Sequence, residues 1–276
     1  MIYDIVTVVY DEDIETHRLQ ARSMALYLSR EVVHRIIVIQ NSVMPDEWPD
    51  DMLHEYGDLV DRVIVMPASA ICEACGRHGW YGQQILKLLI SRHVATERYL
   101  ILDAKNLLVF PLRHHHLENG NKIVSVQHLY LKDNALRGYL QNVERYFNIE
   151  LNGLLPPSHT PFVFPTELVI QMVQWIEQKE GDFAEFFMQH GMVEFLMFSA
   201  YLISTGQLDV PYDFSGPTYT TVWEHWATDE ARIENKIAIC ERDKEPFFSV
   251  HRRAWPCLSA KSYRMITHFW QRRGLI

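Results

Sequence analysis

An acidic and a basic residue follow a buried segment near the middle of the sequence. The apolar run RYLILD ends at Asp103, and Lys105 stands two residues later. In open α/β sheets, ligands bind where the carboxyl ends of the strands meet, because the loops that leave the strands form a crevice there. Asp103 is therefore a candidate to contact a ribose or diphosphate or to hold a cation, and Lys105 could place an ammonium on a phosphate. A turn cap and a solvated lysine are the alternative interpretations.

The segment before this strand is predicted to be an amphipathic helix. Trp80, Gln84 and Lys87 share one flank of it, and Gln83 lies four residues before Lys87. An ammonium on a helix packed beside the Asp103 strand suits donor phosphates, and the glutamine amides suit sugar hydroxyls. The alternative is that Lys87 snorkels from a core helix.

The elements that must position these residues form a predicted doubly wound sheet. Apolar runs rich in β-branched residues predict buried strands at 2–9, 34–40, 60–66 and 98–103. A helix is predicted at 11–30, and residues 41–56 are expected to be a surface loop. Strand, helix and strand at this spacing give right-handed βαβ units and a mostly parallel sheet.

The pattern changes after residue 110. Strands are predicted at 122–128 and 246–250, and helices at 134–147, 167–178, 181–190, 192–205 and 259–273. Residues 156–165 and 212–221 are expected to be loops. We expect one domain over residues 1–276, with a sheet-forming half at 1–110 and a helix-rich half at 111–276.

Three motifs carry a family resemblance. WYGQQILKL (80–88) and YLILDAKNLLV (99–109) resemble a bacterial glycosyltransferase-like family of the GT-A fold, in which such a helix precedes a strand ending in Leu-Asp-x-Asp. FFSVHRRAW (247–255) resembles the closing motif of the same family, which is distantly similar to glycogenin-like transferases. The resemblance implies an α/β GT-A-type (Rossmann-like) fold and transfer of a sugar from a nucleotide-sugar donor to a glycan acceptor. It also implies that residues 1–110 form the nucleotide-sugar-binding half and residues 111–276 the acceptor half.

The chain departs from the family at one important position. Lys105 replaces the second acid of the Asp-x-Asp motif, which in GT-A enzymes holds a divalent cation against the donor diphosphate. The exchange removes an oxygen ligand and adds a positive charge, whereas Mg²⁺ requires several oxygen ligands. Two alternatives remain open: Mn²⁺ or Mg²⁺ held by Asp103 and His251, or a metal-independent reaction in which Lys105 replaces the cation.

The resemblance also implies contacts to the donor at other strand ends. It assigns the nucleotide to the ends of the first two strands, at Val9, Tyr10, Asp11 and Asn41. A histidine in the late segment of glycogenin-like enzymes binds metal or diphosphate, which implies that His251 and the neighbouring Arg252 lie on the donor side. A structural histidine is the alternative.

Candidate acceptor residues lie in the second half. Glu194 is a single acid in an apolar helical segment, where a raised pKa would suit a general base for an inverting reaction, although a retaining reaction needs none. The resemblance also places an acid on the acceptor side, and a structural ion pair is the alternative. Thr160, Phe162 and Trp223 bring hydroxyl and aromatic groups that suit a sugar, but aromatic side chains of this kind also form cores.

Composition limits the classes of partner. The formal charge of -9 and the pI near 5.8 argue against nucleic acid, because phosphate backbones are bound by clustered Lys and Arg. No run reaches the roughly 18 apolar residues of a membrane span, and the first residues lack the basic region of a secretory signal. We expect a cytoplasmic protein, with contact to the inner face of the membrane as an option.

The cysteines do not predict a disulfide framework. The chain has 4 cysteines, too few for a secreted scaffold of this size, which fits a reducing compartment. Cys72 and Cys75 have the spacing of half a zinc site or of a redox pair, but no second pair with that spacing exists.

We therefore expect a glycosyltransferase with Lys87, Asp103 and Glu194 as its catalytic residues. The acceptor would be a glycan or a lipid-linked glycan in bacterial surface polysaccharide synthesis, such as capsule or lipopolysaccharide. The alternative is a catalytically degenerate nucleotide-sugar-binding or scaffolding protein of such a pathway, because the exchange to Lys105 could abolish turnover.

Overall fold

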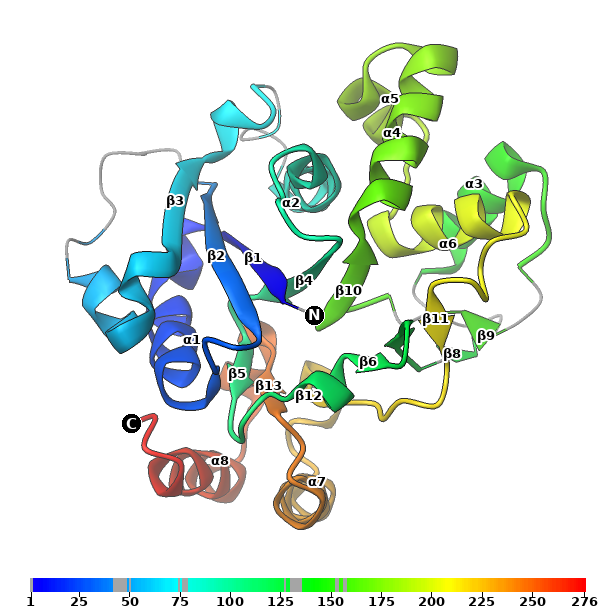
Figure 1. Ribbon diagram of the computed structural model, residues 1–276. Coiled ribbons are helices and arrows are strands. Elements are labelled where there is room, and N and C mark those ends of the chain that lie inside the picture. Colours follow the sequence, from blue (N-terminus) through cyan, green and yellow to red (C-terminus); the bar gives the residue numbers. More distant parts are fainter. Residues whose placement is uncertain are drawn as a thin grey trace.

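The computed structural model describes residues 2–41, 49, 51–73, 75, 79–126, 128–129, 136–151, 154–155 and 158–276. Within this part of the chain, a five-stranded sheet in the order β10-β4-β1-β2-β3 forms the centre of the molecule (Figure 1). Its strands are β1 (Tyr3–Val9), β2 (Val33–Gln40), β3 (Val63–Pro67), β4 (Arg98–Asp103) and β10 (Phe162–Pro165). All neighbouring pairs are parallel except β10 and β4. The predicted α/β fold with a mostly parallel sheet flanked by helices is confirmed.

Two helices cover this sheet from opposite sides. α1 (Ile14–Tyr27) follows β1 and the 3-10 turn η1 (Asp11–Asp13), and α2 (Gly79–Leu89) precedes β4 (Figure 1). Right-handed crossovers require opposite faces here, because the chain moves outward from β1 to β2 and β3 and then returns past β1 to β4. This double cover explains why every residue of β1 is buried.

The return of the chain creates a switch point beside β1. In the sheet register Val8 lies next to Asp103, and Val9 lies next to Gln40. The carboxyl ends of β1, β2 and β4 therefore meet at one edge of the sheet, where the strand order reverses. Open α/β sheets bind their ligands at such an edge.

The second half of the chain is rich in helices, as predicted. They are α3 (Arg137–Phe147), α4 (Thr166–Glu180), α5 (Phe183–Gln189), α6 (Glu194–Ser204), α7 (Glu230–Asp243) and α8 (Ala260–Arg272). All except α7 lie where helices were predicted, with shifted ends; residues 134–135 of the first prediction lie outside the described residues. Only Ile233, Ile237 and Cys240 of α7 are buried, so its apolar stripe is too narrow to stand out in the sequence.

Short strands account for most of the differences from the predicted elements. One small sheet contains β12 (Thr220–Val222), β13 (Phe247–Val250) and β5 (Asn106–Leu108). A second contains β11 (Tyr212–Asp213), β7 (Lys122–Val124) and β6 (Glu118–Asn119). In a third, β8 (His128–Leu129) pairs with β9 (Leu154–Leu155). The strand predicted at 122–128 is thus divided, with residue 127 outside the described part. The predicted loops at 156–165 and 212–221 contain strands. Of the loop at 41–56, residues 42–48 and 50 lie outside the described ranges.

The remaining ordered segments are 3-10 helices: η3 (Met52–Arg62), η4 (Ala68–Ala70), η6 (Ile90–Arg92), η7 (His114–His116), η8 (Glu224–Trp226) and η9 (Arg252–Cys257). Two apolar clusters hold the elements together. The larger joins the central sheet to α1–α6, and the smaller joins β5, β12 and β13 to α7 and α8. Because β5 begins at Asn106, the turn that leaves β4 at Asp103 lies between the two clusters.

Cys72 and Cys75 form a disulfide, with their Cα atoms 5.4 Å apart. The cysteine count did not predict this bond, and Cys240 and Cys257 are free. The disulfide segment packs closely on α2: a Cβ atom at Gly82 would lie 2.2 Å from the Cys75 carbonyl oxygen. Glycine is therefore required at this position of α2 for the observed packing.

No single helix among the described residues is long and apolar enough to cross a membrane. α5 and α6 satisfy the length and composition test only as a pair, and the pair is bent by 101°.

One buried histidine on α1 predicts an acid-sensitive stability. Burial lowers the pKa of His17 from 6.5 to about 4, although the hydrogen bond to Gln20 opposes this shift. The unfolded chain therefore binds the proton first as the pH falls. The contribution of His17 to the free energy of unfolding is complete above pH 6.5. It falls by about 3 kcal/mol as the pH drops from 6.5 to about 4.

This expectation can be measured by chemical denaturation across that pH range. The His17→Asn variant keeps a polar side chain but cannot titrate there, so we expect its free energy of unfolding to fall less steeply than that of the wild type. Parallel pH profiles for the two proteins would show that His17 does not carry the effect.

Candidate active site

A buried lysine joins two carboxylates at the switch-point edge. Lys87 Nζ lies 2.8 Å from Asp103 Oδ1 and 3.3 Å from Glu194 Oε1. The side chains of Lys87 and Glu194 are 4% and 5% exposed, whereas that of Asp103 is 28% exposed. Of the three groups, Asp103 is therefore the one that a ligand can reach, with Lys87 and Glu194 behind it.

The charges of this cluster set its protonation. Burial by itself would lower the pKa of Lys87, but Asp103 and Glu194 outweigh it and raise that pKa above its usual range. Burial would raise the pKa of Asp103, yet Lys105 and Lys87 hold it well below its usual range. For Glu194 burial prevails and raises the pKa, although Lys87 opposes the shift. At neutral pH the ammonium of Lys87 and the carboxylate of Asp103 are thus both charged.

A second ammonium contacts the other oxygen of Asp103. Lys105 Nζ binds Asp103 Oδ2 and lies 3.3 Å from Thr160 Oγ1. The Thr160 hydroxyl in turn donates to Asp103 Oδ2 at 2.8 Å. Each Asp103 oxygen therefore has its own ammonium, with Lys87 on Oδ1 and Lys105 on Oδ2.

The turn that carries Asp103 and Lys105 is closed by Asn106. The Asp103 backbone N–H donates to Asn106 Oδ1 at 2.7 Å, and Asn106 Nδ2 donates to Ser249 Oγ on β13 at 2.9 Å. Gln20 of α1 donates to the backbone carbonyls of both Asp103 and Asn106. Neither Asn106 nor Gln20 is among the site residues predicted from the sequence, because their partners lie 86 and 143 residues away along the chain.

The residues predicted to contact the nucleotide meet at the same edge. Tyr10 follows β1 and donates to the backbone carbonyl of Gly79, and burial raises its pKa to about 12 although the nearby Asn41 amide opposes the shift. Asn41 is 3% exposed, and its N–H donates to the Val9 carbonyl at 2.9 Å. Asp11 is exposed at the start of η1. The side chain of Val9 is buried, so that residue could contact a ligand only through its backbone.

The two glutamines of α2 have different environments. Gln84 is 1% exposed, donates to the Trp80 carbonyl at 3.1 Å and accepts from the Glu194 backbone N–H at 3.3 Å. It therefore caps the first turn of α6 and fixes Glu194, which leaves its amide little capacity for sugar hydroxyls. Gln83 is half-buried.

An aromatic side chain lies beside Lys105. The ring of Trp223 packs on the imidazole of His251 with centroids 4.8 Å apart, and Lys105 Nζ lies 5.9 Å from the Trp223 ring. Burial, followed by the charges of Lys105 and Arg253, lowers the pKa of His251 to about 4, so this imidazole is neutral at pH 7. Arg252 is half exposed and contacts Glu12 Oε2 at 2.6 Å instead of the Asp103 cluster.

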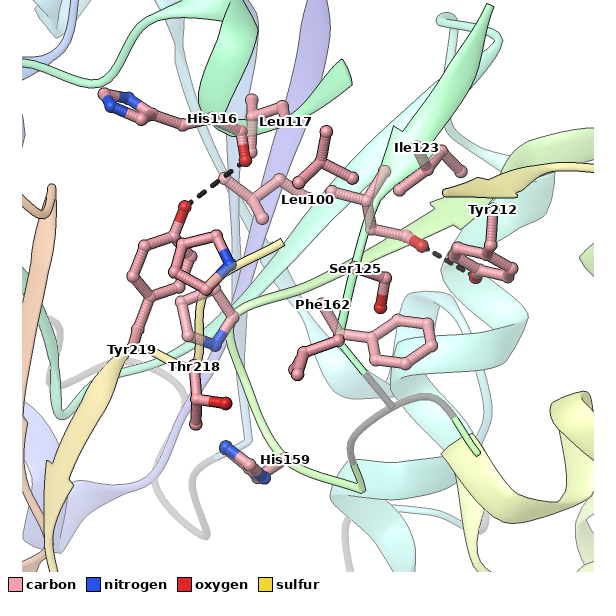
Figure 2. Close-up of a pocket in the computed structure, with 15 residues that line it drawn as sticks. Leu100, His116, Leu117, Ile123, Ser125, His159, Phe162, Tyr212, Thr218 and Tyr219 are labelled. Atoms are coloured by element: carbon pink, nitrogen blue, oxygen red, sulfur yellow. Dashed lines mark hydrogen bonds between the residues drawn. The ribbon is translucent and has the colours of Figure 1, made fainter. Parts of the chain in front are cut away.

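The predicted acceptor residues Thr160 and Phe162 point to different places. The hydroxyl of Thr160 donates to Asp103 Oδ2, as described above. Phe162 is 3% exposed, and its ring lies 4.4 Å from that of Phe195, so it belongs to the core. Phe162 also lines a small cavity, together with His159 and Pro161 (Figure 2). The cavity measures about 40 Å³, room for about three water molecules, which is less than a pyranose ring needs.

The residues at this edge do not fit a Mg²⁺ or Mn²⁺ ion. Both oxygens of Asp103 already bind ammonium groups. Within the described ranges, no group of three His, Cys, Asp or Glu side chains is arranged to hold a metal ion. A hard cation requires several oxygen ligands, and the only predicted ligands, Asp103 and His251, supply one free carboxylate at most.

Comparison with solved structures identifies the fold. The chain is similar to an active-site mutant of LgtC, with a TM-score of 0.55 and 12% sequence identity over 97% of this chain and 95% of that one. It is also similar to the apo structure of WbbM, a bifunctional glycosyltransferase, with a TM-score of 0.52 and 13% identity over 91% of this chain. The match covers 45% of WbbM, so the chain spans about half of that protein. These likenesses show the GT-A fold.

Sequence comparison gives a family. No match was found among curated proteins. A family model described as "Family of unknown function (DUF6492)" matches residues 4–258, which is most of the chain. This match confirms the family resemblance that the motifs around Lys87 and Asp103 carry. The chain belongs to the DUF6492 family of unknown function.

Proposed function

We propose that this protein is a glycosyltransferase that moves a sugar from a nucleotide-sugar donor to a glycan acceptor, with Lys105 in the position of the usual cation. The observation that carries the proposal is the ammonium of Lys105 on the outer oxygen of Asp103, at the switch-point edge of a GT-A sheet. A divalent cation in an Asp-x-Asp enzyme bridges that carboxylate to the donor diphosphate. Lys105 offers a single positive charge at the same carboxylate.

The position of Lys105 supports a donor that carries phosphate. Its ammonium contacts Asp103 Oδ2, while Lys87 contacts Asp103 Oδ1. A diphosphate oxygen that replaces Asp103 Oδ2 on Lys105 would gain a charge-assisted hydrogen bond. Lys87 and Thr160 would hold Asp103 in place during this exchange. The same ammonium would then stabilise the leaving nucleotide as its charge develops.

The geometry gives Glu194 a positioning role in this proposal. Its carboxylate contacts Lys87, its side chain is 5% exposed, and Gln84 fixes its backbone N–H. An acceptor hydroxyl cannot reach a group that is buried behind Lys87 without a rearrangement. We assign Glu194 to holding Lys87 against Asp103, and its function as a general base remains a prediction only for an inverting reaction.

We propose that the acceptor binds at the aromatic side of the cluster. Trp223 lies beside Lys105, and its ring packs on that of His251. The ring centroids of Trp223 and His159 are 6.4 Å apart. Pyranose rings stack on aromatic faces, so Trp223 is the group that would receive an acceptor sugar. Bacterial surface polysaccharide synthesis is the setting that the sequence resemblance suggests, and a lipid-linked glycan is one form of acceptor.

One observation favours a second candidate. Lys105 stands at the position of the second acid of the Asp-x-Asp motif, and its single charge replaces that of a divalent cation. A protein that binds the nucleotide sugar without turning it over, as a scaffold in a biosynthetic complex, does not need the stronger stabilisation of a leaving nucleotide. The two candidates differ in turnover and agree on binding.

The test is a thermal-shift panel with UDP-, GDP-, dTDP- and CMP-sugars, followed by an assay for nucleotide release. A ligand at about one hundred times its dissociation constant stabilises the native state by about 2.7 kcal/mol. We expect one nucleotide class to stabilise the wild type, Lys105→Met to lose that stabilisation, and the exposed control Lys261→Met to keep it. Stabilisation without release in the presence of glycan acceptors would favour the scaffold. The absence of any shift would contradict both candidates.

A further inference from the structure

The buried face of α1 carries a row of polar side chains beside the apolar Ala21 and Met24. His17, Gln20 and Ser23 all have no exposed surface, although a surface helix normally buries its apolar stripe. A buried polar group costs free energy unless its hydrogen bonds are satisfied. Such a row on one helix face therefore needs an explanation in terms of its partners.

The partners of these side chains form one continuous chain. Tyr56 Oη lies 2.9 Å from His17 Nε2, and His17 Nδ1 lies 2.9 Å from Gln20 Oε1. Gln20 Nε2 then lies 2.7 Å from the Asp103 carbonyl oxygen and 3.2 Å from the Asn106 carbonyl oxygen. Tyr56 is also without exposed surface, so the whole chain is closed to water.

The direction of this chain follows from its last member. Two carbonyl oxygens can only accept, so the amide nitrogen of Gln20 must face them and its oxygen must face His17. Nδ1 of His17 therefore carries the proton, and Nε2 accepts from the hydroxyl of Tyr56. Every donor points toward the turn at 103–106, an arrangement in which each bond polarises the next.

Ser23 supplies a second link from α1 to the same region. Its hydroxyl donates to the Gln20 carbonyl at 2.7 Å and accepts from the Leu108 N–H at 3.0 Å. On the opposite side, Asn106 is held by Ser249, as described above. The turn is thus fixed from α1 on one side and from β13 on the other.

We propose that Gln20, oriented by His17 and Tyr56, is a positioning residue that fixes the Asp103–Asn106 turn and so places Asp103 and Lys105 for the donor. The placing of Asp103 and Lys105 for the donor rests on the proposed function. The fixing of the turn by Gln20 does not depend on any ligand. Gln20 supplies hydrogen bonds to the turn carbonyls on both sides of Lys105, so without it the turn has two buried acceptors to satisfy.

Substitutions can separate this role from simple packing. Gln20→Met keeps the length of the side chain and removes both donors. His17→Leu removes the donor that orients Gln20, whereas in His17→Asn the amide nitrogen can still donate to Gln20 Oε1. Ser199→Ala is the matched control, because Ser199 is equally buried and bonds only within α6 to the Phe195 carbonyl.

The first readout is amide hydrogen exchange of the peptide that covers 103–108, compared with a peptide from β1. We expect exchange at 103–108 to rise about tenfold in Gln20→Met and His17→Leu, the scale of one lost hydrogen bond to a buried group. His17→Asn should restore protection, and Ser199→Ala should leave the peptide as in the wild type. Equal exchange at 103–108 in Gln20→Met and Ser199→Ala would overturn the proposal.

The second readout is the affinity for UDP, GDP and dTDP, measured by calorimetry. The same two variants should bind the preferred nucleotide about tenfold more weakly, and His17→Asn should recover the affinity. Faster exchange with unchanged affinity would overturn the link between the turn and the donor. If the wild type binds none of the three, the proposed function fails, and the exchange measurements alone decide whether Gln20 positions the turn.

Discussion

Replacing Lys87 by methionine is expected to destabilise the protein by about 3 kcal/mol or more near neutral pH, the scale observed when one partner of a buried ion pair is removed. Asp103 would keep Lys105, but Glu194, with a side chain 5% exposed, would lose its only cation in the cluster. Because burial already raises the pKa of Glu194, the variant should bind a proton there more readily. The penalty should therefore shrink as the pH falls.

Urea denaturation of matched variants checks this expectation. Lys261→Met removes a lysine that is 56% exposed and paired with Glu230, and should change the free energy of unfolding by less than about 1 kcal/mol. Adding Glu194→Gln to Lys87→Met should recover part of the loss, because no buried charge is then left unpaired. A Lys87→Met protein as stable as Lys261→Met would show that the buried pair is not needed for the fold.

Replacing Lys105 by aspartate is expected to convert nucleotide binding from metal-independent to metal-dependent. The variant loses the ammonium on Asp103 Oδ2 and gains a second carboxylate, which recreates the Asp-x-Asp pattern. In EDTA the affinity for the preferred nucleotide should fall by about 100-fold, the scale of a lost charged hydrogen bond. Addition of Mn²⁺ should recover much of it, because the carboxylate pair supplies oxygen ligands.

Lys105→Met is the control for this exchange. It removes the ammonium without adding a carboxylate, so its affinity should fall in EDTA by less than that of Lys105→Asp and should not respond to Mn²⁺. A Lys105→Met variant that regains affinity with Mn²⁺ would mean that the remaining residues already form a metal site, contrary to our interpretation.

The sheet could be predicted from sequence because its signals are local. The run from Ile2 to Val9 is apolar except for Asp4 and Thr7, and its β-branched residues indicate a strand covered on both faces. The placement of Asp103 at a strand end follows in the same way. Lys87 was identified because a single cation on an otherwise apolar helix requires a reason, and its two carboxylate partners supply one.

The partners of these residues could not be predicted, because they are tertiary. Gln84 has the position of a ligand-binding amide, but its oxygen is taken by the Glu194 backbone, 110 residues away along the chain. Phe162 stands in a loop-like, proline-rich segment, yet it pairs with β4 and enters the core. The buried polar row of His17 and Gln20 did leave a signal, polar residues three apart on one helix face, but only the fold reveals which turn they hold.

The central claim, that Lys105 replaces the cation, is tested most directly by one calorimetric comparison on the wild-type protein. The affinity for the nucleotide that stabilises it would be measured in EDTA and again with Mn²⁺. Our account predicts the same affinity in both, since the ammonium of Lys105 is present on Asp103 in either buffer. Binding that is lost in EDTA and restored by Mn²⁺ would contradict it and would return Asp103 to the role of a metal ligand.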